Sequence, residues 1–543
     1  MSKNSEHKRQ VPDYNPPSPG GLAAFNSAIF TTSYNLALSK WLEWFGLFSE
    51  TSRFMEPYWN AAQNFMAMQE EKKAAPSWES AMEFMELFMF DMQLASRAAA
   101  ASVNAMNQYH GRETAETLTA LSNMMLNSKV EDYVRYSERK LKIVDAVVNT
   151  YPRVIRDIEP EYGFHFDGDR YVKVAETDRF TLYQVLPTDT GMDVKTGGKP
   201  TLIIPPYVLG ANILALLPAE NRSYVHAFAN QGIPTYIRIV KPIAETPAVQ
   251  TLTGEDDALD TRYFCEKILE RQGSPVTLNG YCQGGFLAAL HLLSGELDGL
   301  ADALITCVAP MDGTCCRSLS NYMESLPPSL RDPALSYKRL PSGNEVVDGK
   351  IMGWIFKLRS IERDAPILTF YRDLAIFGQG ANDKAPEISK ASAAIGHWLT
   401  YDRTDIPVGI SKLSYDSFTN PISRDGTLPI KLFDRSLNFK RLKEKGIKWL
   451  LCIAEGDDLI DKEAALAPLD HVNAEVAYFP KGHVAIATSW CFPASECSLD
   501  MDFFGTACSH GQSRGPVRFQ LDLDQAIKEN ELAVYWDEME DRE

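Results

Sequence analysis

Residues 276–290 read Val-Thr-Leu-Asn-Gly-Tyr-Cys-Gln-Gly-Gly-Phe-Leu-Ala-Ala-Leu, and this stretch decides the fold. Its first part predicts a strand, and its apolar last part predicts a buried helix after a turn. A strand, a tight turn and a helix in this order form a nucleophile elbow, with Cys282 at the turn. Gly280 and Gly284 flank the cysteine because side chains would clash in such a strained turn. The stretch predicts that Cys282 is a nucleophile; a buried cysteine at an ordinary Gly-rich turn is the alternative.

Two backbone N–H groups near this turn are candidates for an oxyanion site. The N–H of Gln283 opens the helix, where the helix dipole favours a thiolate and a developing negative charge. The second donor of such sites comes from the loop after an earlier strand. Residues 202–204 form a short apolar strand, and two prolines stiffen the loop that leaves it. We expect the N–H of Val208 to be this donor, with that of Tyr207 as the alternative.

A histidine and an acid that would complete a catalytic triad follow two later strands. The apolar residues 447–454 predict a strand buried on both faces, and Asp458 follows shortly after it. Residues 474–479 predict the next strand, which leads to His483. Loops at the carboxyl ends of neighbouring parallel strands converge on one site. Nucleophile, acid and histidine is the order of the α/β-hydrolases, so we predict that both residues serve the cysteine, with Asp457 as the alternative acid.

Several motifs around these residues resemble those of the polyhydroxyalkanoate synthases, polyester polymerases of the α/β-hydrolase superfamily with a cysteine nucleophile. The elbow sequence Gly-Tyr-Cys-x-Gly-Gly is the most specific of them. The similar segments are Gly280–Gly285, Leu202–Pro206 with Leu214 and Pro218–Asn221, Tyr415–Pro421, Ala454–Asp458 and Gly482–Ala485. The resemblance covers residues 165–490.

The resemblance implies an acyltransferase that forms polyester from hydroxyacyl-CoA. Cys282 would attack the thioester with the help of His483, CoA would leave, and a hydroxyl group would take the acyl group from the cysteine. No cofactor is implied, because the coenzyme A thioester is itself the substrate. The family's Trp-Arg-Asn-Pro segment and its Trp-rich C-terminal segment are missing here. Two alternatives therefore stay open: a hydrolase with the same triad (a polyhydroxyalkanoate depolymerase or an acyl-CoA thioesterase) and a non-catalytic granule-associated protein.

The composition favours an enzyme of the reducing cytoplasm. The 543 residues include 54 basic and 72 acidic side chains, and the net charge of −18 disfavours nucleic acid as a partner. We expect neither a signal peptide nor a transmembrane segment, because Met1–Pro19 is polar and no apolar run is long enough. Nine scattered cysteines fit a cytoplasmic location, to which the resemblance adds the surface of polyester granules. We expect no metal site, since paired Cys-x-x-Cys spacing is absent among Cys491, Cys497, Cys508 and His510.

The pattern along the chain predicts four segments. We expect a flexible tail over 1–20, a helical domain over 21–160, the catalytic domain over 161–490 and a C-terminal extension over 491–543. Alternating strands and helices in the third segment predict an α/β fold with a mostly parallel sheet, which begins with an antiparallel hairpin. A cap or lid is expected as an insertion over about 311–430 of this fold. We also expect a homodimer.

One stripe of the helical segment has two interpretations. Met82, Met85, Met89 and Met92 recur at helical spacing. We interpret the stripe as part of a core, and the alternative is an adaptable apolar surface for polyester, lipid or a partner helix.

Overall fold

The computed structural model describes residues 19–71, 78–127, 130–188, 191, 194, 197–325, 331, 336–353, 360–379, 387–503, 511–526 and 529. Cys508, His510, residues 1–18 of the predicted tail and residues 530–543 of the predicted extension lie outside these ranges. The chain divides into two compact units. The first unit comprises Met1–Met55, Arg97–Arg153 and Glu362–Glu387, and the second comprises Glu56–Ser96, Val154–Ile361 and Ile388–Glu543.

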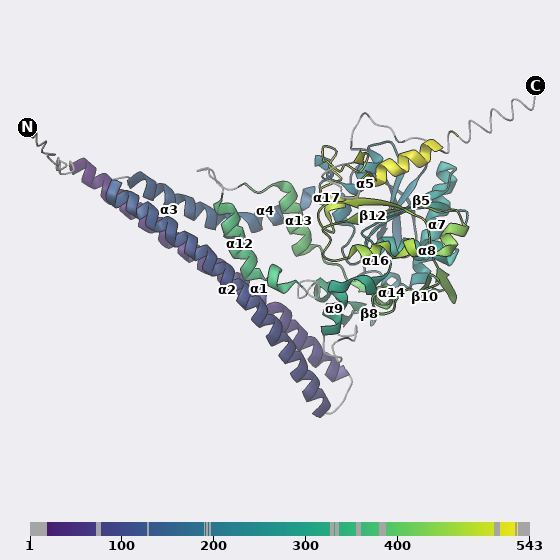
Figure 1. The fold of residues 1–543 in the computed structure, drawn as a ribbon, viewed down its shortest axis with the longest axis horizontal. Coiled ribbons are helices and arrows are strands. Elements are labelled where there is room, and N and C mark those ends of the chain that lie inside the picture. Colours follow the sequence, from purple (N-terminus) through teal and green to yellow (C-terminus); the bar gives the residue numbers. More distant parts are fainter. Residues whose placement is uncertain are drawn as a thin grey trace, which may run out of the picture. The chain divides into compact units, whose positions relative to one another are not determined.

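An eight-stranded sheet with the order β1-β2-β4-β3-β5-β6-β12-β13 lies at the centre of the second unit (Figure 1). The pairs β1–β2 and β2–β4 are antiparallel, and every later pair is parallel. This order and these directions are those of the α/β-hydrolase fold, so the predicted fold class and the initial hairpin are confirmed. The strands span Tyr171–Glu176 (β1), Phe180–Val185 (β2), Thr201–Ile204 (β3), Thr235–Val240 (β4), Val276–Tyr281 (β5), Ala301–Cys307 (β6), Lys448–Ala454 (β12) and Glu475–Phe479 (β13).

Both faces of the sheet are buried, each in its own core. Each strand contributes to both cores, because its successive side chains point to opposite sides. In β3, Ile203 packs into one core, while Leu202 and Ile204 pack into the other. Every residue of β5 is buried, which explains why the central strands read as continuous apolar runs. The first core includes side chains of α5 (Tyr224–Ala229), α13 (Lys390–Tyr401) and α17 (Ala485–Thr488), and the second includes side chains of α7 (Gly254–Gln272) and α8 (Gln283–Ser294).

Shorter elements complete the second unit. Its other helices are α6 (Pro247–Gln250), α9 (Arg317–Ser325), α14 (Val408–Thr419), α15 (Lys440–Glu444) and α16 (Lys462–Leu466). Three small sheets contain β7 (Tyr337–Arg339), β8 (Glu345–Val347) and β9 (Ile406–Pro407), then β10 (Thr427–Leu432) and β11 (Arg435–Asn438), then β14 (Asp502–Phe503) and β15 (Ser513–Arg514). The predicted insertion between β6 and β12 thus carries helices and short strands in its described residues.

The region before the sheet is helical, as predicted. It contains α1 (Pro19–Glu71), α2 (Trp78–Asn127), α3 (Val130–Asp145), a π-helical turn (Ala146–Thr150) and α4 (Tyr151–Asp157). In the first unit, side chains of α1, α2 and α3 share a core with α12 (Pro366–Gly378); α11 (Ile361–Asp364) precedes α12. Gly46 lets α1 approach α12 closely, since a Cβ at this position would lie 2.8 Å from the ring of Phe370. No helix within the described ranges is apolar over a long enough stretch to cross a bilayer.

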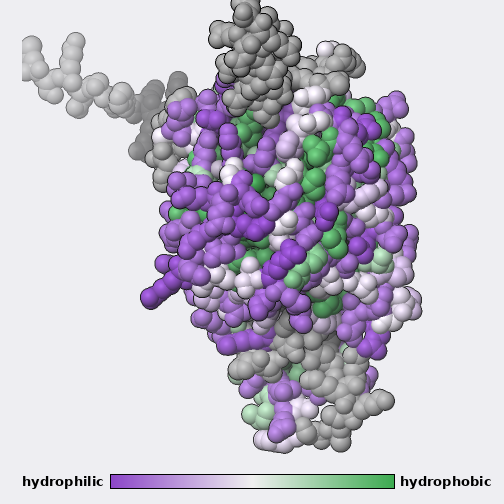
Figure 2. Space-filling view, turned by 90° about the vertical axis from the view of Figure 1, so that its right-hand side faces the viewer, coloured by the Kyte–Doolittle hydropathy of each residue, from purple (hydrophilic) through white to green (hydrophobic). Residues whose placement is uncertain are grey.

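The core interpretation of the methionine stripe is wrong. Met82, Met85, Met89 and Met92 of α2 are 45–61% exposed, whereas Leu87 of the same helix is 5% exposed. Helical spacing shows which side chains share a face, and it leaves open whether that face meets a partner. The face in Figure 2 is mostly hydrophilic, with apolar side chains in small groups among polar ones.

Candidate active site

The turn between β5 and α8 holds Cys282 in a strained conformation. Its φ of 51° and ψ of −124° are unusual for a residue with a side chain, as expected of a nucleophile elbow. The two flanking positions must be glycine, because neither has room for a side chain. A Cβ at Gly284 would lie 2.1 Å from the carbonyl oxygen of Ile204, and one at Gly280 would lie 2.3 Å from the Cα of Gly285. The cysteine is 7% exposed at the N-terminus of α8, where the sequence predicts it.

His483 forms a hydrogen bond with an acid from the neighbouring strand loop, and that acid is Asp457. The imidazole Nδ1 lies 2.7 Å from Oδ2 of Asp457. The other carboxylate oxygen accepts the backbone N–H groups of Leu459 at 2.9 Å and Ile460 at 3.0 Å. A carboxylate can only accept, so Nδ1 carries a proton and Nε2 is the nitrogen that can take another. The prediction of Asp458 as the acid is therefore corrected to the alternative, Asp457.

The backbone beyond the two strands explains this shift by one residue. After β12 and β13 end, the N–H of Gly456 still donates to the carbonyl of Lys481 at 2.7 Å. This extra bond extends the pairing of the two chains, so Asp457 is the first residue beyond it, opposite the loop of His483. The sequence shows where an apolar strand ends, but it does not show such a bond between two loops.

The imidazole of His483 is buried between two groups that favour its charged form. Burial lowers the pKa of His483, but the charge of Asp457 and then that of the Cys282 thiolate outweigh it and raise the pKa to about 10. The Cys282 sulfur is close enough to raise the pKa of the imidazole by its charge. Among the described residues, however, no atom is placed to form a hydrogen bond of normal distance and angle with Nε2. We regard the pair as a close electrostatic contact, since apo geometry at catalytic hydrogen bonds is often loose.

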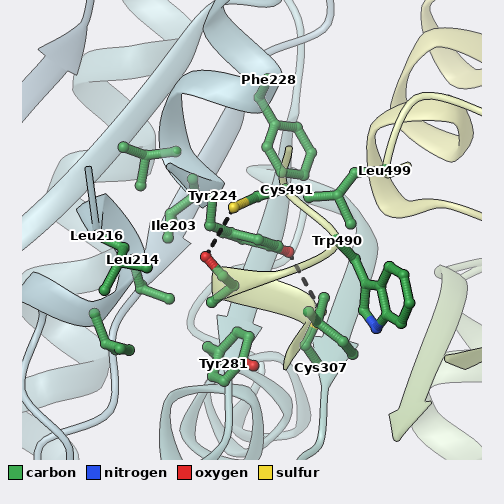
Figure 3. Close-up of a cluster of buried hydrophobic side chains, with 14 of the residues drawn as sticks. Ile203, Leu214, Leu216, Tyr224, Phe228, Tyr281, Cys307, Trp490, Cys491 and Leu499 are labelled. Carbon is green, nitrogen blue, oxygen red and sulfur yellow. Dashed lines mark hydrogen bonds between the residues drawn. The ribbon is translucent and has the colours of Figure 1, made fainter. Parts of the chain in front are cut away.

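Tyr281 connects the elbow to the histidine loop, a role that the sequence did not indicate. Its hydroxyl donates to the backbone carbonyl of His483 at 2.8 Å, and its ring stands edge-on to the imidazole. Tyr281 is fully buried and packs against Tyr224, whose hydroxyl lies 2.9 Å from Oδ1 of Asn279 and 3.3 Å from the sulfur of Cys307 (Figure 3). The only signal was its place in the Gly-Tyr-Cys motif.

The loop after β3 brings its N–H groups to the elbow, but they contact a side chain there. The N–H groups of Tyr207 and Val208 lie 3.1 and 3.2 Å from Oε1 of Gln283. Two residues of the inserted segment also fix this loop. Thr404 donates its hydroxyl to the carbonyl of Tyr207 at 3.0 Å, and the indole of Trp398 donates to that of Leu209 at 2.9 Å. The role of Val208 as an oxyanion donor stays a prediction.

The cysteines and histidines that the sequence offers as metal ligands can be judged only within the described residues. The described cysteines form no disulfide with one another, and Cys491 and Cys497 are buried. The thiol of Cys491, which follows α17, donates to the carbonyl of Ala487 in that helix at 3.0 Å (Figure 3). Among the described residues, no group of three or more His, Cys, Asp or Glu side chains is arranged to hold a metal ion.

Comparisons with known proteins give structural similarity alone. No protein-family model matches the chain, and no curated protein matches its sequence. Among solved structures, the carboxylesterase CesB (YbfK) from Bacillus subtilis is similar at 10% identity over 63% of this chain and 93% of its own, with a TM-score of 0.29. A proline iminopeptidase of Mycobacterium smegmatis is similar at 11% identity over 67% and 99%, with a TM-score of 0.32. A naproxen esterase from Bacillus subtilis is similar at 12% identity over 63% of this chain and 94% of its own, with a TM-score of 0.30.

Proposed function

We propose that this protein is a polyhydroxyalkanoate synthase-like acyltransferase that forms polyester from hydroxyacyl-CoA. The observation that carries the proposal is a cysteine at the strained elbow beside a buried imidazole whose pKa is raised by Asp457. An imidazolium held in this way stabilises a neighbouring thiolate, which is the reactive form of cysteine.

The thiol nucleophile suits a thioester substrate. The thiolate of Cys282 attacks the acyl carbon of hydroxyacyl-CoA, and backbone N–H groups of the elbow and the diproline loop stabilise the oxyanion. The carbon–sulfur bond to CoA breaks, and the thiol of CoA leaves with a proton from His483. The acyl-cysteine is again a thioester, so little free energy is lost and the acyl group stays reactive.

The second half of the reaction decides the product. His483 takes the proton of an incoming hydroxyl, whose oxygen attacks the acyl-cysteine and releases the thiolate of Cys282. A hydroxyl of another hydroxyacyl group gives an ester and a longer chain. Water gives the free acid, which is the reaction of the alternative hydrolases. We propose that the segment inserted after β6 excludes water and so favours the ester.

The same proposal includes the surroundings in which such an enzyme works. Hydroxyacyl-CoA is the proposed partner of the site, and no cofactor takes part. A cytoplasmic homodimer at the surface of polyester granules is the state that we propose for the chain, with the exposed methionines of α2 as apolar contacts.

Incubation of the purified full chain with 3-hydroxybutyryl-CoA tests the function. The release of CoA is followed through the loss of the thioester absorbance, and the products are separated by size. We expect polymer from the wild type and no release of CoA from Cys282→Ala, which should still fold because alanine fits the turn. Free acid in place of polymer would support the hydrolase, and release of CoA by Cys282→Ala would remove the proposed mechanism.

A further inference from the structure

The carboxamide of Gln283 joins three parts of the second unit. Its oxygen Oε1 accepts the N–H groups of Tyr207 and Val208, and its nitrogen Nε2 donates to the hydroxyl of Ser414 on α14 at 2.8 Å. Backbone N–H groups can only donate, so the amide oxygen must face the loop and the amide nitrogen must face the hydroxyl. Gln283 is 4% exposed, so water competes little for these bonds.

The two N–H groups on Oε1 are those among which the sequence predicts the second oxyanion donor. Successive N–H groups that converge on one position form a nest, which suits an anionic oxygen. Here they converge on a neutral oxygen at 3.1 and 3.2 Å. This oxygen belongs to the residue whose own N–H begins α8 beside the nucleophile. One position cannot hold both this amide oxygen and the oxyanion of a tetrahedral intermediate.

We propose that Gln283 is a positioning residue that fills the oxyanion site of the resting protein with its carboxamide oxygen, which leaves the site during acyl transfer. The inference rests on the proposed function, because it needs an acyl group at Cys282. A charged oxyanion accepts hydrogen bonds roughly twice as strongly as a neutral oxygen, so it displaces the carboxamide. Only hydrogen bonds change in this step.

Ser414 determines how firmly the carboxamide stays in place. Its hydroxyl holds Nε2 from the side opposite to the loop. Ser414 lies on α14, in the segment inserted after β6, and the same segment fixes the loop through Thr404 and Trp398. A movement of α14 that releases Nε2 would free the oxyanion site, so the inserted segment controls the readiness of the nucleophile for acyl substrates.

Two reagents that modify Cys282 by different routes test this proposal. p-Nitrophenyl acetate acylates a thiolate through a tetrahedral oxyanion, whereas iodoacetamide alkylates it in one displacement without an oxyanion. The rate of modification of Cys282 in the full chain is followed by mass spectrometry. Gln283→Met removes the acceptor, keeps the backbone N–H and has a similar length. We expect acylation to become about tenfold faster, the effect of about one net hydrogen bond, and alkylation to stay unchanged.

Two further variants give the sign of the effect independently. Ser414→Ala keeps Gln283 but removes its anchor, so acylation should become faster by a smaller factor. Gln283→Glu places a charged acceptor against the two N–H groups, so acylation should become slower than in the wild type where this carboxyl group is ionised. Alkylation again serves as the internal control, and circular dichroism checks that each variant folds.

The opposite signs would overturn the proposal. If Gln283→Met acylates on the order of 10²-fold more slowly with unchanged alkylation, the side chain braces the donors and does not compete for their site. Unchanged acylation in Gln283→Met would also overturn it. These results leave the proposed function intact. If neither reagent modifies Cys282 of the wild type, the proposed function fails, and this inference fails with it.

Discussion

The exchange of Asp457 for asparagine tests the proposed triad most sharply, because the geometry dictates how the new amide lies. Oδ1 of Asp457 accepts the N–H groups of Leu459 and Ile460, and only an oxygen can do so. In Asp457→Asn, the amide nitrogen must therefore take the place of Oδ2, 2.7 Å from Nδ1 of His483. Two donors then oppose each other, unless the imidazole moves its proton to Nε2.

Both outcomes impair catalysis, and their size can be worked out. Loss of the charge-assisted hydrogen bond costs about 1.5–3 kcal/mol, or a factor of roughly 10–150. A proton on Nε2 leaves the imidazole unable to accept the proton of the incoming hydroxyl, and the same change in a serine triad lowers kcat by about 10⁴. We expect kcat/KM for the release of CoA from 3-hydroxybutyryl-CoA to fall by on the order of 10²–10⁴.

Asp458→Asn is the matched control, since it makes the same chemical change one residue further along the loop. We expect its kcat/KM to stay within about threefold of the wild type, as for a substitution outside the reacting groups. Thermal unfolding of both variants shows whether the loop is intact. The reasoning fails if Asp458→Asn loses activity and Asp457→Asn keeps it, because the hydrogen bond to Nδ1 would then have no catalytic role.

Three further predictions concern the elbow and the histidine. Gly284→Ala places a Cβ 2.1 Å from the oxygen of Ile204 and should destabilise the fold by about 2–4 kcal/mol in denaturant unfolding, whereas Gly111→Ala, with nothing within 4 Å, should stabilise its helix by about 0.5–1 kcal/mol. Tyr281→Phe removes the bond to the carbonyl of His483 and should lower kcat about tenfold with little change in KM, as measured by initial rates. The pKa of His483 is raised from 6.5 to about 10, so the charged imidazole stabilises the fold fully below pH 6.5, and this contribution is lost as the pH rises through 10. The difference in unfolding free energy between the wild type and His483→Gln should shrink over this range, by at most about 5 kcal/mol; a difference that grows with pH would contradict the sign.

The elbow could be predicted from the sequence because its requirements are local. Gly280, Cys282 and Gly284 lie within five residues, and the clashes that exclude side chains follow from the turn itself. The strand order follows from alternating strands and helices, which the topology rules restrict to a few arrangements. The position of His483 followed from the same rules, since it stands after the last parallel strand.

Contacts between distant segments could not be predicted in this way. The choice between Asp457 and Asp458 depends on one backbone bond between Gly456 and Lys481. The contacts of Gln283 with Val208 and Ser414 join residues 75 and 131 positions apart, and no pattern in the sequence records them. The boundaries predicted for the domains stay predictions for the same reason, because they depend on which distant segments pack together.

The two halves of the candidate site are held by different kinds of contact, and this difference bears on what can move. The acid and the histidine are fixed by backbone bonds at the ends of β12 and β13 and by the hydroxyl of Tyr281. Cys282 is held by α8, which is fully buried and whose His291 lies 3.4 Å from Asp257 of α7. Asp257 also forms a buried ion pair with Arg238 of β4. Burial raises the pKa of Asp257, but Arg238 and His291 lower it by more, so the net pKa lies below its usual value.

The loop after β3 lies near the same buried pair, because burial first raises the pKa of the Tyr207 phenol and the charge of Asp257 raises it further. Strand β4 and helices α7 and α8 therefore share one buried anchor. Such an anchor can maintain the strain at Cys282, which costs on the order of 1–3 kcal/mol. The carboxamide of Gln283 forms hydrogen bonds with the loop after β3 on one side and with Ser414 of the inserted segment on the other. A side chain can change its rotamer without disturbing the strands and helices around it, so the carboxamide is the part of the site best suited to respond to an acyl group.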